Sequence, residues 1–212
     1  MKRYILSCPT LRRELEALLP KSDPDTQVIY LPTNLHSSPP QLRAYLQTTI
    51  DHLPEDTQQI LLCVSGCGGG TSRLKATTGQ LVIPKTRDCI DILLSQQTLA
   101  TLDRDSQGIF LTASWMESFR NSSLDLNTLT EAIGEEAARE RLKLIYQGFT
   151  HFYIIDTGTY DLAPVVAYIQ PLVTLLDGTL TILPGHYGLL HKLLSGDLDQ
   201  DFQVIPKGGV SL

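Results

Sequence analysis

Short apolar runs alternate along this chain with segments of helical periodicity, and no other feature constrains the fold as strongly. A strand that pairs in parallel with the next one needs a crossover connection, and a helix is the usual crossover. The alternation therefore predicts a three-layer α/β fold, with a mostly parallel sheet and helices on both faces. The runs expected to form strands lie at 4–6, 28–31, 60–64, 81–84, 109–112, 153–158 and 181–184.

Helix-start signals fall between these runs. The strongest is Ser38-Pro39-Pro40-Gln41, which offers a capping side chain, a proline in the first turn and a glutamine three residues after the cap. Within the last predicted helix, over 162–176, Pro171 favours an early end. The residues expected to cap helices are Thr10, Ser38, Asp88, Ser114, Asn127 and Asp161.

The length of 212 residues suits a single α/β domain with a core of its own. Its halves echo one another, since the run at 81–84 and its helix resemble the run at 181–184 and the segment after it. One interpretation is a domain of two similar sub-lobes, at about 1–98 and 108–212, with a cleft between them. The other is that any two strand–turn–helix units look alike.

Charge and hydropathy limit the classes of partner that we expect for this protein. The net charge of −6 gives no basic surface for nucleic acid. The start of the chain lacks the apolar stretch of a signal peptide, and no run is long enough to span a bilayer. We therefore expect a cytoplasmic protein without a membrane or nucleic-acid partner. Its four cysteines would then stay reduced, for ligation, catalysis or packing.

Three cysteines and one histidine follow the first four predicted strands: Cys8, His36, Cys67 and Cys89. Residues just past the carboxyl ends of parallel strands gather at one edge of a sheet, where α/β proteins bind ligands. Three thiolates and an imidazole are ligands for zinc or an iron–sulfur cluster. We expect these four to ligate such a metal. The alternatives are that Cys89 packs its helix onto the sheet and that His36 is a solvated surface residue.

A glycine-rich loop, Ser65-Gly66-Cys67-Gly68-Gly69-Gly70-Thr71, follows the third predicted strand. Glycines let a ligand approach the backbone closely, and successive N–H groups can form an anion nest. We expect Gly66, Gly68 and Gly69 to bind a small-molecule or cofactor ligand. A turn with an incidental cysteine is the alternative.

Polar residues also follow strands in the second half. Asp156 and His186 are the candidate catalytic groups, and Trp115 and Tyr160 are candidate cofactor contacts. All would face the same cleft as Cys67 if their strands run parallel to the first set. Asp156 could equally cap the turn that follows it, and Trp115 could belong to the core.

Several short motifs resemble one family. The match spans most of the chain, and its elements are Leu35-His36, Gly66-Cys67-Gly68, Leu81-Val82-Ile83-Pro84, Asp88-Cys89-Ile90, Leu111-Thr112, Trp115, Asp156-Thr157-Gly158 and Tyr160-Asp161. They resemble the domain-of-unknown-function family 1638 of bacteria and archaea. The chain departs from that pattern at Val64, Ser65, Lys85 and Arg87, which removes a histidine expected beside Asp88-Cys89.

The resemblance implies that Cys8, His36, Cys67 and Cys89 are family positions. It also implies a link to corrinoid-dependent methyltransferase systems, and therefore to one-carbon metabolism, with a corrinoid as a further candidate cofactor. A corrinoid or methyltransferase protein would then be a partner. It supplies no established activity.

We therefore expect a metal-dependent enzyme or enzyme accessory with a Cys3His site at the carboxyl edge of its sheet, and as an enzyme a transferase. The first alternative is a non-catalytic binding protein, in which the glycine loop holds the ligand and the cysteines are structural. The second is a metal-free enzyme with Cys67 or Cys89 as nucleophile.

Overall fold

The computed structural model describes residues 2–19, 25–33, 35, 38–64, 66–120 and 122–212. The chain divides into two compact units. The first comprises Met1–Leu102 and His186–Leu212, and the second comprises Asp103–Gly185. The last segment thus returns to the first unit, whereas the sequence placed it in the second sub-lobe.

The first unit is built on a five-stranded sheet, in which the first four strands are parallel and the last is antiparallel to its neighbour. Across the sheet the strands are β2 (Thr26–Tyr30), β1 (Arg3–Ser7), β3 (Gln59–Cys63), β4 (Gln80–Pro84) and β8 (Phe202–Ile205). Because β2 and β3 lie on opposite sides of β1, the order of the strands reverses between β1 and β3. In open α/β sheets the ligand crevice lies outside the carboxyl ends of the strands at such a point.

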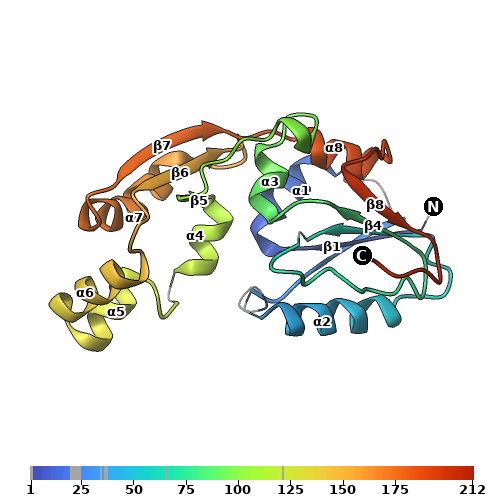
Figure 1. Cartoon of the computed structure of the whole chain (residues 1–212), viewed down its shortest axis with the longest axis horizontal. Coiled ribbons are helices and arrows are strands. Elements are labelled where there is room, and N and C mark those ends of the chain that lie inside the picture. Colours follow the sequence, from blue (N-terminus) through green and yellow to red (C-terminus); the bar gives the residue numbers. More distant parts are fainter. Residues whose placement is uncertain (1, 20–24, 34, 36–37, 65, 121) are drawn as a thin grey trace. The chain divides into compact units, whose positions relative to one another are not determined.

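Helices cover both faces of this sheet, as Figure 1 shows. Leu42, Leu46 and Ile50 of α2 are buried against one face, together with Leu6 and Leu62 of the central strands. The other three α-helices lie on the opposite face. The helices of this unit that are described over their whole length are η1 (Pro9–Leu11), α1 (Arg12–Leu18), α2 (Pro39–Asp51), α3 (Cys89–Leu94), η3 (Leu99–Thr101) and α8 (Gly188–Ser195).

The second unit has a three-stranded parallel sheet with one helix-covered face. Phe152 and Ile154 of the central strand are fully buried, in one core cluster that also contains residues of all four helices. Its elements are β5 (Gly108–Leu111), α4 (Ala113–Phe119), α5 (Leu126–Ile133), α6 (Glu135–Ile145), β6 (His151–Asp156), α7 (Leu162–Leu175) and β7 (Thr179–Pro184). The predicted α/β class with mostly parallel strands is therefore confirmed.

Helix starts agree with the sequence at three places and differ at others. Ser38, Asp88 and Asp161 are N-caps as predicted, although the Ser38 side chain makes no capping hydrogen bond. Thr112 caps α4, two residues before the predicted Ser114, because its hydroxyl accepts from the backbone of the first turn.

The helix predicted over 128–147 is two helices. Asp125 rather than Asn127 caps α5, and its carboxylate accepts from the N–H of Thr128. Gly134, with φ of 84°, separates α5 from α6. Such a backbone conformation is open to glycine and strained for other residues, so the break has a local cause. In the described part of the chain, no helix has the length and apolarity needed to cross a membrane.

Candidate functional site

Two of the predicted strand-end thiols meet at the carboxyl edge of the first unit's sheet. Cys8 directly follows β1, and Cys89 is the first residue of α3, five positions after β4. The hydroxyl of Thr10 lies 2.8 Å from Sγ of Cys8 and donates to Sγ of Cys89 at 3.3 Å. The two thiols also hydrogen-bond to each other. The result is a compact cluster of two sulfurs and one hydroxyl.

The short helix after β1 makes this cluster possible. Thr10 was predicted to cap the first helix, but a 3-10 helix begins at Pro9, and Thr10 lies inside it. Its hydroxyl is therefore within hydrogen-bonding distance of Sγ of both Cys8 and Cys89. The spacing Cys8-Pro9-Thr10 is the sequence signal for this role, although the same threonine also fits the pattern of a helix cap.

The pKa values of the two thiols are shifted in opposite directions. The hydrogen bond with Cys8 lowers the pKa of the Cys89 thiol, and Thr10 lowers it further, whereas burial and the Asp88 carboxylate oppose this. The same hydrogen bond, together with burial, raises the pKa of Cys8 strongly. These opposite shifts mean that Cys89 loses its proton more readily than Cys8, which then donates to it. Thiolates are the form in which cysteine ligates metals and attacks electrophiles.

Cys67 is held close to this edge by its backbone. Its N–H donates to the carbonyl oxygen of Arg87, two residues before Cys89, at 3.0 Å. Its φ is 39°, and its partly buried side chain packs against the hydrophobic core on the α2 side of the sheet. Among the described residues, no three His, Cys, Asp or Glu side chains are arranged to hold a metal ion. His36 lies outside the described residues, so the four-ligand site stays a prediction.

Cys63 differs from the other cysteines, as expected. It is the last residue of β3 and has no exposed surface. Burial raises the pKa of its thiol to about 12.

Four N–H groups of the glycine-rich loop donate to carbonyl groups of the protein itself. Gly66 and Cys67 donate to backbone carbonyls of the segment between β4 and α3, and both Gly69 and Gly70 donate to Gly66. These bonds close the loop on itself and fix it to the neighbouring segment. The binding role predicted for Gly66, Gly68 and Gly69 stays a prediction.

Close packing against α2 also explains two of these glycines. A Cβ at Gly70 would lie 2.6 Å from Cδ2 of Leu42, and one at Gly68 would lie 3.0 Å from Cγ of Pro39. Gly68 has in addition a φ of 71°. The loop therefore needs glycine for steric reasons as well as for its turn.

The two charged residues directly before Cys89 stabilise the start of α3. The guanidinium of Arg87 makes two hydrogen bonds to the buried carboxylate of Asp91, at 2.8 and 2.9 Å. Asp88 accepts from the N–H groups of Ile90 and Asp91 as the N-cap of α3. The Arg87 guanidinium is therefore paired with Asp91, four residues along the chain.

The candidates of the second half belong to two different units. Asp156 ends β6, and its Oδ1 accepts from the N–H of Gly158, so it caps the following turn. Trp115 stacks on Phe119 with ring centroids 4.4 Å apart and packs against the core of the second unit.

Tyr160 donates to the carbonyl oxygen of Ile155 in that same unit. His186 lies in the first unit, where its N–H donates to Leu93 and its ring lies 3.3 Å from the Gln96 amide. The cleft predicted to unite these residues with Cys67 stays a prediction.

Comparison with known proteins supports the resemblance seen in the sequence. A family described as "Protein of unknown function (DUF1638)" matches residues 30–194. The matched segment includes His36, Cys67 and Cys89 and begins after Cys8. No curated protein and no solved structure matches the chain. Because the match covers more than half of the sequence, the chain belongs to the DUF1638 family.

Proposed function

We propose that this protein binds a thiophilic metal ion, zinc or the iron of a cluster, through Cys8 and Cys89 at the carboxyl edge of the first unit's sheet. The observation that carries the proposal is the cluster of Cys8, Thr10 and Cys89, with its sulfur–oxygen distances of 2.8 and 3.3 Å. Two sulfurs held together before any ligand arrives are half of a tetrahedral thiolate site.

The donor chemistry suits such a metal. The lowered pKa of Cys89 favours the thiolate, and a metal ion would displace the proton that Cys8 retains. The position beside β1, at the point where the strand order reverses, is where α/β sheets bind their ligands.

Cys67 and His36 are the proposed third and fourth ligands. The backbone of Cys67 is tied to the segment that carries Cys89, so a rotation of its side chain is the change we propose to bring its sulfur to the metal. With all four ligands the site would be closed and structural, whereas an open position would make it catalytic. The corrinoid-linked methyl transfer implied by the family, with its partner protein, stays a prediction.

Substitution with cobalt tests this proposal without an activity assay. The reduced protein would be titrated with Co²⁺, whose thiolate charge-transfer absorption counts the sulfur ligands, and its zinc, iron and cobalt content as purified would be measured. We expect Cys8→Ser and Cys89→Ser each to remove most of the charge-transfer absorption. Cys63→Ala is the matched control, because Cys63 is buried in β3, and it should leave the spectrum unchanged.

A second candidate function is favoured by the same hydrogen bonds. A thiolate on Cys89 that accepts from Cys8 and Thr10 is also suited to act as a nucleophile without a metal. The two candidates separate in one experiment. If the protein carries no metal, shows no Co²⁺–thiolate absorption and is alkylated fastest at Cys89, the metal proposal is wrong and the nucleophile is favoured.

A further inference from the structure

A groove of about 720 Å³ runs along the outer side of α2, on the first unit. One wall is the helix itself, and the other is the segment 73–77. The volume falls in the range of pockets that bind small molecules. The side chains that matter to its chemistry are Arg43, Gln47 and Asp51 from the helix, with Arg73, Lys75 and Thr77 from the segment.

The alternating pattern of the segment sends its cations outward. Leu74 and Ala76 are fully buried, whereas Arg73, Lys75 and Thr77 are exposed on the groove side. The segment is fixed by backbone bonds to the end of the chain, where Arg73 donates to Ser211 and Ala76 donates to Gly209. The outward side chains therefore project from a well-held backbone.

Hydrogen bonds join the helix to the segment, or to the residues just before it, at three levels. At one end Nη2 of Arg43 donates to Oγ of Ser72 at 3.0 Å and to the carbonyl oxygen of Gly69 at 2.7 Å. In the middle the Gln47 amide bonds to both backbone groups of Lys75.

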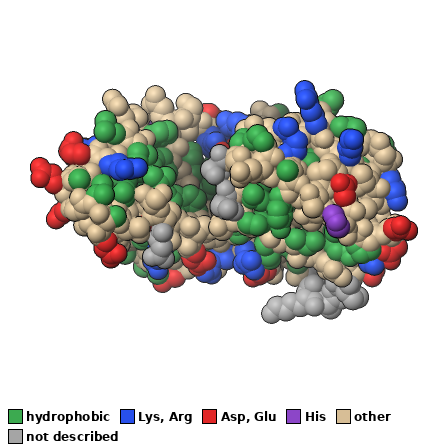
Figure 2. Space-filling view, turned by 90° about the horizontal axis from the view of Figure 1, so that it is seen from below, with side chains coloured by type: hydrophobic (Ala, Val, Ile, Leu, Met, Phe, Trp, Pro, Cys, Tyr) green, Lys and Arg blue, Asp and Glu red, His purple; other side chains and the backbone are tan. Residues whose placement is uncertain are grey.

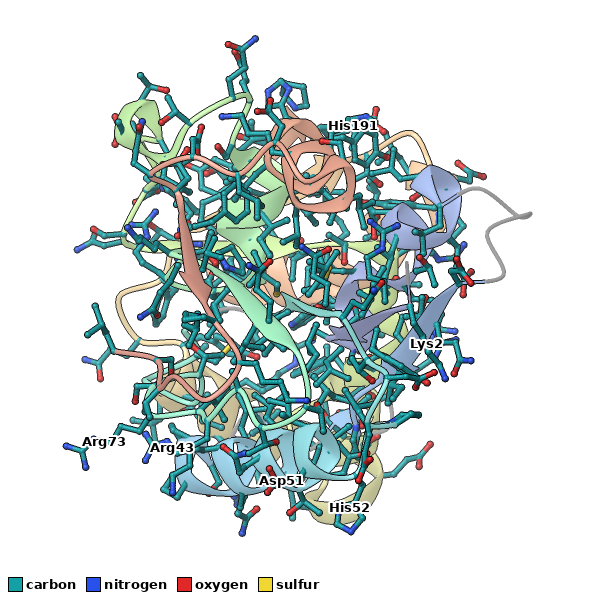
Figure 3. The ribbon with its side chains drawn as sticks, turned by 90° about the vertical axis from the view of Figure 1, so that its right-hand side faces the viewer. Lys2, Arg43, Asp51, His52, Arg73 and His191 are labelled. Atoms are coloured by element: carbon teal, nitrogen blue, oxygen red, sulfur yellow. The ribbon has the colours of Figure 1, made fainter. Side chains whose placement is uncertain are left out.

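At the other end the Thr77 hydroxyl donates to Asp51 at 2.8 Å. Arg43 and Asp51 lie eight residues apart on the helix, which corresponds to about 12 Å. These bonds fix the segment against the helix, with a guanidinium at one end of the groove and a carboxylate at the other. Figure 3 shows both residues along α2, with Arg73 extending from the segment beside them.

The charges in the groove are not neutralised by the protein. Within the described residues, no ion pair involves Arg43, Arg73 or Lys75, and Asp51 is the one carboxylate of the lining. This local excess of positive charge stands on a chain whose net charge is −6. Figure 2 looks onto the α2 side of the first unit, and several Lys and Arg side chains gather there.

We propose that this groove binds a small molecule that carries a phosphate group. Guanidinium groups present paired N–H donors that match phosphate oxygens, and a lysine adds a mobile positive charge. The phosphate would lie between Arg43, Arg73 and Lys75. The Asp51–Thr77 end would accept hydroxyl groups from the rest of the ligand, as a sugar phosphate or a nucleotide provides. The site is separate from the thiol cluster and shares none of its residues.

Calorimetric titration with inorganic pyrophosphate, and then with ADP, tests this proposal on the full chain. The key variants are Arg73→Gly and Lys75→Gln. Arg73 has a left-handed backbone, with φ of 60°, so glycine relieves strain there while it removes the charge. The side chain of Lys75 is exposed and its structural bonds are made by its backbone. Both variants should fold and should bind pyrophosphate at least tenfold more weakly.

Two further variants make the result specific. Asp51→Asn removes the one negative charge of the lining and should strengthen pyrophosphate binding severalfold. Arg141→Ala, at an exposed position of α6 in the second unit, is the charge-matched control and should bind like the wild type. The proposal is overturned if pyrophosphate and ADP do not bind at millimolar concentration. It is equally overturned if Arg141→Ala weakens binding as much as Arg73→Gly does.

Discussion

Gly188, the first residue of α8, lies so close to Gln96 that a Cβ on it would fall 1.4 Å from the Gln96 carbonyl oxygen. Gln96 follows α3 by two residues, and Gly188 lies ninety-two positions later in the chain. This contact joins the returning C-terminal segment to the first half of the chain. It also gives a reason for glycine at a helix start that has no capping side chain.

The first prediction concerns this contact. Gly188→Ala should lower the free energy of unfolding by about 3 kcal/mol, because the added methyl group can be accommodated only if the backbone of Gln96 or of α8 moves. Denaturant unfolding monitored by circular dichroism would measure the loss. Gly196→Ala, at the other end of the same helix, is the control. Gly196 has a φ of 85° and open space around it, so alanine there should cost only about 1 kcal/mol of backbone strain. Equal losses in the two variants would contradict the steric argument.

The second prediction concerns Pro171, which lies inside α7. The helix continues to Leu175 because Leu172, Val173 and Leu175 are buried in the core of the second unit, which outweighs the missing backbone hydrogen bond. Pro171→Ala restores an N–H donor to this turn, and Pro171 is exposed. The unfolding free energy of the variant should therefore rise by about 1 kcal/mol.

Pro164→Ala is the matched control for this substitution. Pro164 lies in the first turn of the same helix, where N–H groups have no intrahelical acceptor in any case. Its replacement should leave the free energy of unfolding unchanged or lower it slightly, because alanine increases the conformational entropy of the unfolded chain. A gain in stability at both positions would mean that the backbone hydrogen bond missing at Pro171 is not the cause of the gain.

The sequence predicted the four parallel strands of the first unit, because such strands are local apolar runs, but it did not predict the antiparallel strand β8. It could not predict that residues 186–212 return to the first unit. The run at 181–184 and the helix after it look locally like β4 and α3. The path is decided instead by pairing between distant residues, such as Leu81 with Ile205 and Pro84 with Phe202. No local pattern contains that information.

In the candidate site, too, some features could be predicted from the sequence and others could not. That Cys8 and Cys89 meet follows from strand ends in a parallel sheet, so topology alone predicted it. The orientation of Cys67 depends on a φ of 39° and on packing against α2, neither of which a sequence motif reveals. Arg87 forms an ion pair with Asp91 because the two are four residues apart, with the carboxylate in the first turn of α3. The spacing of these two charges is visible in the sequence and is sufficient to predict their pairing.

The third prediction concerns pH and Cys63. Burial raises the pKa of this thiol from 9.0 to about 12, so the folded state disfavours its ionisation. Its contribution to stability is complete below pH 9 and is lost as pH rises from 9 towards 12, because the unfolded chain ionises first. Between pH 8 and pH 10.5 the loss from this group should be about 2 kcal/mol. Denaturant titrations at the two pH values should show a smaller decrease for Cys63→Ala than for the wild type. An equal decrease in both proteins would exclude Cys63 as its source.

The fourth prediction tests the hydroxyl that links the two thiols. Thr10→Val keeps the shape of the side chain but removes the hydrogen bond to Sγ of Cys89, which helps to lower the pKa of that thiol. With one donor fewer, the thiolate is less stable, and the pKa of Cys89 should rise. Alkylation by iodoacetamide requires the thiolate, so its rate at Cys89 below pH 9 should fall severalfold in the metal-free variant. Mass spectrometry of each cysteine peptide across a pH series gives the rates, with Thr48→Val on the exposed side of α2 as control. An unchanged rate profile at Cys89 would mean that Thr10 does not stabilise the thiolate, and that Cys8 alone supports it.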